Sequence, residues 1–219
     1  MPGAVATHEL DVLKAGGGPP ANRGGAGGGE FGGGSAREFE RERRMYLTGI
    51  SVALAAVLMF FMALASSYIV RKGTGTDWQP IDTPRILWLN TAVLVASSIT
   101  AEIAKRKLAT SGVGEFRNWW AITTALGMLF LGGQIVAWRV LAEQGLFLAT
   151  NPSSSFFYLL TASHGAHLLI GLLALLYVAL RAGNPMWRRR AIAAEGVAIY
   201  WHFLDGLWVF LLLLLNSGR

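Results

Sequence analysis

One uncharged stretch, LTGISVALAAVLMFFMALASSYIV at residues 47–70, establishes the class of this protein. An α-helix rises about 1.5 Å per residue, so about 20 apolar residues cross the roughly 30 Å hydrocarbon core of a bilayer. Within lipid, the backbone has to satisfy its own hydrogen bonds, and a helix does so within a single segment. The stretch therefore predicts a transmembrane helix over residues 46–70.

Four further apolar runs of similar length follow, at residues 86–104, 119–141, 156–180 and 193–215. Hydrophobic side chains make up 53% of the 219 residues and charged side chains 15%, against roughly 25% charge in a soluble domain. A large soluble protein would need polar helices to cover such runs, and the sequence predicts none. The prediction is an all-α integral membrane protein with five transmembrane helices.

The N-terminal segment differs in composition from the rest of the chain. Residues 1–35 contain 12 glycines and few large apolar side chains. Such a segment buries too little surface to offset the entropy that is lost on ordering. We therefore divide the chain into a disordered Gly-rich tail with a basic juxtamembrane segment, residues 1–44, and a five-helix membrane domain, residues 45–219.

The basic residues are distributed unevenly between the two sides of the predicted helices. Of the Lys and Arg residues near the spans, twelve fall on the side of the N-terminus and five on the opposite side. Cytoplasmic loops carry the excess of Lys and Arg, so the N-terminus is predicted to be cytoplasmic and the C-terminus outside. This distribution explains the net charge of +6 without nucleic acid, and membrane lipids are the expected surroundings.

Four polar side chains lie near the middle of the last two predicted spans: His164 and His167 on the fourth, His202 and Asp205 on the fifth. Each pair is spaced i, i+3, which places both members on one face of a helix. An unpaired Asp at this depth is costly. We therefore expect a polar cluster at the interface of the two helices, with a hydrogen bond between a histidine and Asp205. Proton handling and haem or metal ligation are the alternative interpretations of the histidines.

Residue types that enzymes and metal sites commonly use are otherwise sparse. The chain has no Cys, which excludes Cys-ligated zinc, iron–sulfur clusters and c-type haem attachment. No nucleophile–base pair, paired catalytic carboxylates or phosphate-binding loop is recognisable. We predict no catalytic residue and no metal site on this chain.

Two local features concern helix ends and helix packing. The run NPSSS at residues 151–155 predicts a helix start with the serines as caps. Five glycines inside the predicted spans are interpreted as sites of close helix packing: Gly127, Gly132, Gly133, Gly165 and Gly171.

A signature near the C-terminus, Glu195 followed by YWHFLD at residues 200–205 and by Trp208, resembles the pattern E-x4-Y-W-H-F-V-D-x-x-W of subunit III of haem–copper cytochrome c oxidases. Weaker matches extend the resemblance over residues 45–215. They are the H-G-x-H-x-x-x-G pattern from His164 to Gly171, L-N-T and S-S between Leu89 and Ser98, and Gln134 with Trp138. The number of predicted spans resembles the five-helix bacterial form of that family.

The resemblance implies a subunit without redox chemistry of its own, in a terminal oxidase of the bacterial cytoplasmic (inner) membrane. Haem and copper would lie in partner subunits, with subunit I as the main contact and subunit II in the same complex. The chain would stabilise the catalytic subunit, keep structural phospholipid ordered beside it and support proton uptake. Glu195, Glu102 and Gln134 are the candidate proton-collecting or lipid-contacting residues.

The chain departs from the family pattern at two positions. Val57 stands where the family usually has a Glu shortly before a pair of Phe residues, and Ala137 stands at the Glu position beside Trp138. The role in proton uptake that is associated with the first Glu therefore does not carry over to Val57. Two other classes are left open by the residues: a component of a quinol oxidase or nitric oxide reductase system, and a transporter or membrane haem protein that uses the histidines.

Overall fold

The computed structural model describes residues 30–75, 78, 86–110, 112–145, 151–181 and 187–217. Five helices make up almost all of these residues: α2 (Glu30–Thr74), α3 (Ile86–Thr110), α4 (Val113–Glu143), α5 (Pro152–Arg181) and α6 (Trp187–Asn216). Each is long and apolar enough to cross a membrane, and each contains one of the five predicted spans. The prediction of an all-α fold with five membrane-spanning helices is confirmed.

The helix α2 begins earlier than the first predicted span. It starts at Glu30, so residues 30–44 are helical although the sequence places them in the tail and the juxtamembrane segment. Residues 1–29, which carry most of the predicted Gly-rich tail, lie outside the described residues. The membrane helices belong to a compact unit that spans Arg41–Arg219.

Short-range hydrogen bonds set two of the helix ends. Asn151, and not one of the serines, accepts the Ser154 backbone N–H on its Oδ1 at 2.8 Å, and Pro152 opens α5. Proline suits this first position because the N–H that it lacks would have no helical partner. Between α3 and α4, Gly112 has a φ of 92°, a conformation that a residue with a Cβ rarely adopts. This turn lets α4 fold back along α3, and an ion pair between Lys107 and Glu115 at 2.8 Å joins the two helices there.

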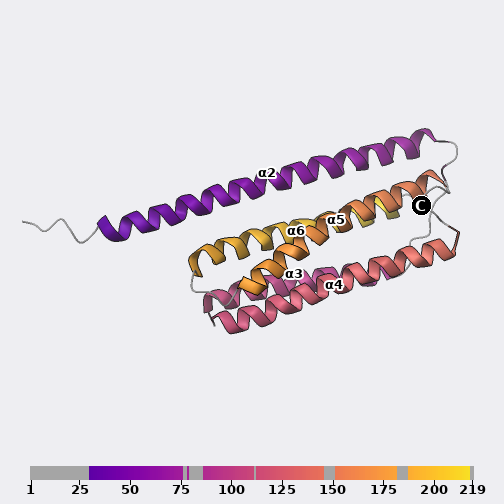
Figure 1. Ribbon diagram of the computed structural model, residues 1–219. Coiled ribbons are helices and arrows are strands. Elements are labelled where there is room, and N and C mark those ends of the chain that lie inside the picture. Colours follow the sequence, from indigo (N-terminus) through magenta and orange to yellow (C-terminus); the bar gives the residue numbers. More distant parts are fainter. Residues whose placement is uncertain are drawn as a thin grey trace, which may run out of the picture. The chain divides into compact units, whose positions relative to one another are not determined.

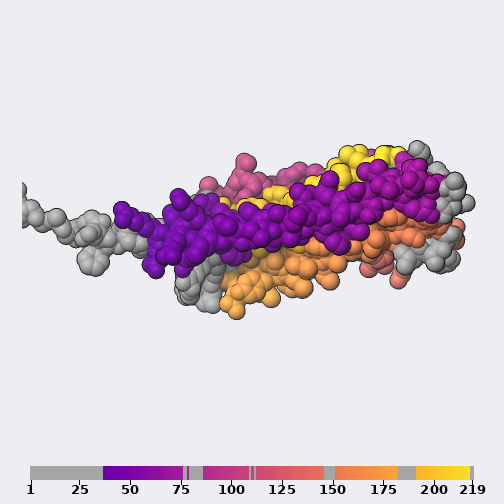
Figure 2. Space-filling view, turned by 90° about the horizontal axis from the view of Figure 1, so that it is seen from above, coloured from indigo at the N-terminus to yellow at the C-terminus, as the bar shows by residue number. Residues whose placement is uncertain are grey.

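Helices α3, α4, α5 and α6 form a four-helix bundle in which α3 packs on α4, α4 on α5, α5 on α6 and α6 on α3. The helix α2 lies on the outside of this bundle. Its side chains bridge the distance to α5 and α6, along which it lies in Figure 2. Two of them, Tyr46 and Ile50, reach the bare backbone of Gly196 on α6.

Large aromatic side chains fill the bundle, and glycines make room for them. Trp201 is fully buried, and a Cβ on Gly127 would lie 2.7 Å from its Cη2 atom, while one on Gly171 would lie 3.2 Å from its Cε3 atom. Gly133 likewise leaves no space for a Cβ, because the Asn90 amide lies against it. Close packing is thus confirmed at these three glycines. The prediction of close packing is wrong for Gly132 and Gly165, where a Cβ would meet nothing within 4 Å.

Candidate functional site: polar side chains at membrane depth

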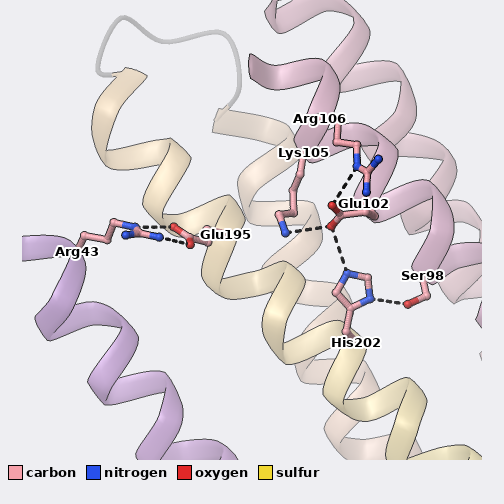
Figure 3. Close-up of polar contacts among 7 residues, drawn as sticks. All are labelled: Arg43, Ser98, Glu102, Lys105, Arg106, Glu195 and His202. Atoms are coloured by element: carbon pink, nitrogen blue, oxygen red, sulfur yellow. Dashed lines mark hydrogen bonds and ion pairs between the residues drawn. The ribbon is translucent and has the colours of Figure 1, made fainter. Parts of the chain in front are cut away.

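The contact between α3 and α6 contains a chain of polar side chains (Figure 3). The Nδ1 atom of His202 lies 2.5 Å from the hydroxyl of Ser98. Its other ring nitrogen, Nε2, lies 3.9 Å from the carboxylate of Glu102, which is beyond hydrogen-bond distance. Glu102 in turn accepts from Lys105 at 3.0 Å and from Arg106 at 3.2 Å. This row of polar side chains thus extends from the end of the bundle where Lys105 and Arg106 lie to the middle of α6.

We call that end the basic end of the bundle; α3 ends there and α6 begins there. The spanning part of α6 is Ala191–Asn216, and His202 is eleven residues from its first residue. With the rise of an α-helix, the His202 backbone lies about 16 Å into the span. A polar side chain at this depth has no water to satisfy it, so its partners have to come from protein.

His164 has surroundings of a different kind. Its side chain is fully buried on α5, and its ring centroid lies 5.0 Å from that of Trp208, 6.1 Å from Phe130 and 6.4 Å from Phe61. Among the described residues, neither ring nitrogen has a hydrogen-bond partner. The imidazole therefore packs as an aromatic ring at the point where α2, α4, α5 and α6 come together.

His167, one turn further along α5, is held by its own helix. Its Nδ1 lies 2.8 Å from the carbonyl oxygen of Ser163, and its ring packs on Phe61 with centroids 5.3 Å apart. The hydroxyl of Tyr200 on α6 donates to the His167 carbonyl oxygen at 3.1 Å. This residue therefore contacts α2 through its ring and α6 through its backbone.

Asp205 is buried beside Ser98, and within the described part of the chain no hydrogen bond of ordinary geometry reaches either of its carboxylate oxygens. The expected hydrogen bond between a histidine and Asp205 is therefore not formed in this structure. The reason lies in helix geometry: residues spaced i, i+3 are about 60° apart around a helix axis. That angle lets His202 contact Ser98 on α3 while Asp205 stays buried in the bundle. On α5, His164 packs among the rings of Trp208, Phe130 and Phe61, and His167 bonds to its own helix.

Glu195 forms the one strong polar contact between α2 and α6 that Figure 3 shows. Both of its carboxylate oxygens accept from the Arg43 guanidinium, at 2.9 Å from Nε and 2.5 Å from Nη2. Sequence reasoning singled out Glu195 but missed Arg43, which is one of several arginines in a basic stretch. It also missed Ser98 as a partner of His202, although Ser98 lies within the S-S motif. Since both oxygens of Glu195 are engaged by Arg43, this contact is a clamp between helices.

Gln134, the third candidate for proton collection or lipid contact, lies inside the bundle. It is buried on α4, and neither atom of its amide has a partner among the described residues. A buried side chain does not contact the surrounding lipid, so its place in the structure favours a role in packing. Of the three candidates, Glu102 is the one that belongs to a polar chain reaching the basic end.

The described residues contain no group of three or more His, Cys, Asp or Glu side chains that could hold a metal ion. The three histidines at membrane depth also have different contacts: His202 faces α3, His167 packs on Phe61 of α2, and His164 packs among aromatic rings of α2, α4 and α6. These residues therefore offer distinct structural contacts and no shared donor set.

We expect the Arg43–Glu195 contact to hold α2 on the bundle. Arg43→Ala and Glu195→Ala should each lower the free energy of unfolding by about 1 kcal/mol, since the pair is partly exposed and its attraction is weakened accordingly. The double variant should lose no more free energy of unfolding than the less stable of the two single variants. The measurement is thermal unfolding in detergent, with Arg44→Ala as the control for loss of one positive charge. Additive losses in the double variant would contradict the clamp.

Comparison with known protein families gives these features a context. The family described as Cytochrome c oxidase subunit III matches residues 42–217, which include all the polar contacts above. The chain belongs to the cytochrome c oxidase subunit III family. The resemblance inferred from the C-terminal signature is thereby confirmed, and the chain is a subunit of a haem–copper oxidase complex and a multi-pass membrane protein.

Curated relatives agree with this membership of the cytochrome c oxidase subunit III family. Cytochrome c oxidase subunit 3 of Thermostichus vulcanus is 35% identical over 173 residues, which cover 76% of this chain and 84% of the relative. The protein of the same name from Synechocystis is 32% identical over 172 residues, covering 76% of this chain and 72% of the relative. A probable cytochrome c oxidase subunit 3 of Mycobacterium tuberculosis is 33% identical over 172 residues, which cover 76% of this chain and 85% of the relative.

Proposed function

We propose that this chain is a non-catalytic subunit III of a cytochrome c oxidase that stabilises the catalytic subunit and supports its turnover. The observation that carries the proposal is that the three histidines among the described residues have their contacts within the chain itself. His202 is engaged by Ser98, His167 by the Ser163 carbonyl, and His164 by the aromatic rings that enclose it. Haem and copper then reside in partner subunits I and II, and electrons are transferred from cytochrome c there.

The exposed surface of the helices supports a role in covering another membrane protein and in ordering lipid. Large apolar side chains are exposed on all five helices, for example Met59 on α2, Leu89 on α3, Leu129 on α4, Leu173 on α5 and Leu213 on α6. Such surfaces bind lipid chains and apolar helices equally well. We propose that part of this surface lies on the catalytic subunit and that structural phospholipid is ordered on the remainder.

A contribution to proton uptake is assigned to Glu102 in this proposal, and no longer to Glu195. Glu102 lies at the basic end, where Lys105 and Arg106 hold its carboxylate near the surface. If the excess of Lys and Arg faces the cytoplasm of a bacterium, the basic end is the side from which an oxidase takes up protons. The N-terminus would then be cytoplasmic, the C-terminus outside, and the complex in the cytoplasmic membrane.

The proposal is tested by purifying the oxidase from cells with and without this chain. We expect the same haem and copper content per catalytic subunit in both preparations, and a shorter active lifetime during turnover in the preparation that lacks the chain. A Soret band or bound copper in the purified chain alone would overturn the proposal. Co-purification with a quinol-oxidising partner in place of a copper-containing subunit II would transfer it to a quinol oxidase.

A further inference from the structure

We propose that the interior of the four-helix bundle binds a water molecule that is shared by Asn90 on α3, Gln134 on α4 and His164 on α5. All three residues are buried, with 5%, 3% and 0% of their surface exposed. The site lies within the chain, so it stands whether or not the proposed function holds.

The polar atoms of these three side chains lack partners within the protein. Among the described residues, no hydrogen bond reaches Asn90 Nδ2, either polar atom of the Gln134 amide, or either ring nitrogen of His164. Buried polar atoms of folded proteins are almost always hydrogen-bonded, either to other protein groups or to ordered water. A bound group that supplies the missing hydrogen bonds is therefore expected in this part of the bundle.

Contacts between α4 and α5 place Gln134 beside His164. Phe130 and Trp138 lie four residues before and after Gln134, so the three side chains share one face of α4. The ring of Phe130 packs on that of His164 with centroids 6.1 Å apart, and the Trp138 indole N–H donates to the Thr161 hydroxyl at 3.1 Å. Gln134 thus faces α5 at the level between Thr161 and His164, which are one turn apart.

Asn90 enters the same layer from α3. Its amide lies against the backbone of Gly133, the residue before Gln134. The residue after it, Thr91, accepts from the Trp208 indole at 3.0 Å, and the Trp208 ring centroid lies 5.0 Å from that of His164. The unpaired atoms from α3, α4 and α5 therefore gather in one layer of the bundle, next to Trp208 of α6.

This layer is far from both ends of the spanning helices. Gln134 is nine residues from Glu143 at the end of α4, and His164 is twelve residues from Pro152 at the start of α5. With the rise of an α-helix, these separations correspond to about 14 Å and 18 Å. Because the side chains are also buried within the bundle, the missing partner is neither lipid nor another subunit.

The mixture of unpaired atoms identifies water as the bound group. The amide nitrogens of Asn90 and Gln134 only donate, the Gln134 amide oxygen only accepts, and the neutral imidazole of His164 supplies one donor and one acceptor. An anion would satisfy only the donors and a cation only the acceptors, and neither ion would find a charge to balance it among these side chains. A buried water molecule typically makes about three hydrogen bonds, both as donor and as acceptor.

A double-mutant cycle in thermal unfolding tests the shared water, with the protein in detergent. Gln134→Leu and His164→Phe should each lower the midpoint by about 2–4 °C, because each leaves the water and the other side chain short of a hydrogen bond. The double variant should fall no further than the less stable single variant, since both unpaired groups are then gone. Higher midpoints in the single variants, or a double variant that shows the sum of the two shifts, would overturn the water site.

Thr124→Val supplies the matched control for this cycle. Thr124 is a buried polar residue of α4 as well, but its hydroxyl donates to the carbonyl oxygen of Trp120 at 2.9 Å and lies outside the layer. Combined with His164→Phe, it should give a shift equal to the sum of the two single shifts. The same departure from additivity as with Gln134→Leu would contradict a specific link between Gln134 and His164.

Direct observation distinguishes a shared water from a direct hydrogen bond between the two side chains. We expect a cryo-EM map of the complete oxidase, at a resolution that shows ordered water, to contain a solvent peak within about 3.2 Å of the Gln134 amide and of a His164 ring nitrogen. The peak should be missing from the map of the double variant. A direct bond between Gln134 and His164 without a solvent peak would overturn the proposal, even if the cycle shows coupling.

Discussion

Replacing Trp208 with alanine should lower the free energy of unfolding of the membrane domain by about 3–5 kcal/mol, the range for removal of a large buried aromatic side chain. Trp208 is fully buried, and its ring centroid lies 5.0 Å from both Phe130 and His164. Its indole N–H donates to the hydroxyl of Thr91 at 3.0 Å. One side chain therefore joins α6 to α3, α4 and α5, and the cavity left by alanine would loosen all three contacts.

The conservative variant Trp208→Phe separates packing from hydrogen bonding. It retains most of the ring and loses the bond to Thr91, so we expect a loss of about 1 kcal/mol plus the effect of a smaller ring. Both variants are compared by thermal unfolding in detergent and by retention of helical circular dichroism. A loss below about 1 kcal/mol for Trp208→Ala would show that the bundle does not depend on this contact.

Gly127→Leu should be the most damaging glycine substitution, with a loss of about 3 kcal/mol, at the upper end of the usual cost of overpacking. Its added Cβ alone would lie 2.7 Å from the Trp201 ring and 3.1 Å from Leu172 Cδ1. Trp201 is fully buried and its indole N–H donates to Ser97 at 3.0 Å, so the ring is not free to turn away. The helices α4 and α6 would have to move apart.

Gly132→Leu is the control for this prediction, since it makes the same chemical change five residues further along α4. A Cβ at Gly132 meets nothing within 4 Å, so the leucine would point outward and its better helix propensity would even favour the fold slightly. The measurement is again the midpoint of thermal unfolding in detergent. Similar midpoints for the two variants would refute the close contact between Gly127 and Trp201.

For the polar residues at membrane depth, the sequence predicted their position along the helix but not the residues that they contact. The i, i+3 spacing identified His202 and Asp205 as neighbours on one side of a helix, and their position within the apolar run indicated their depth. Their partners are far away in the chain: Ser98 is 104 residues from His202, and Arg43 is 152 residues from Glu195. Spacing along one helix carries no information on which other helix stands opposite.

The glycines illustrate the same division. All five lie in apolar runs and look alike in sequence, yet Gly127, Gly133 and Gly171 face a neighbouring helix whereas Gly132 and Gly165 face open space. Gly132 and Gly133 are adjacent, so they point about 100° apart around α4. Only the direction in which that helix is turned determines which of the two becomes a contact.

The sequence by itself determined the class of protein, the five helices and the family, because these depend on local properties: the length of apolar runs, the missing charges and a short signature. The tertiary structure decided that His202 joins α3, that His164 packs among aromatic rings and that Glu195 clamps α2. The physical reason is that each helix satisfies its own backbone in lipid and is therefore free to turn about its axis. Its orientation is set by the packing of large side chains against bare backbone, and that is a property of pairs of helices.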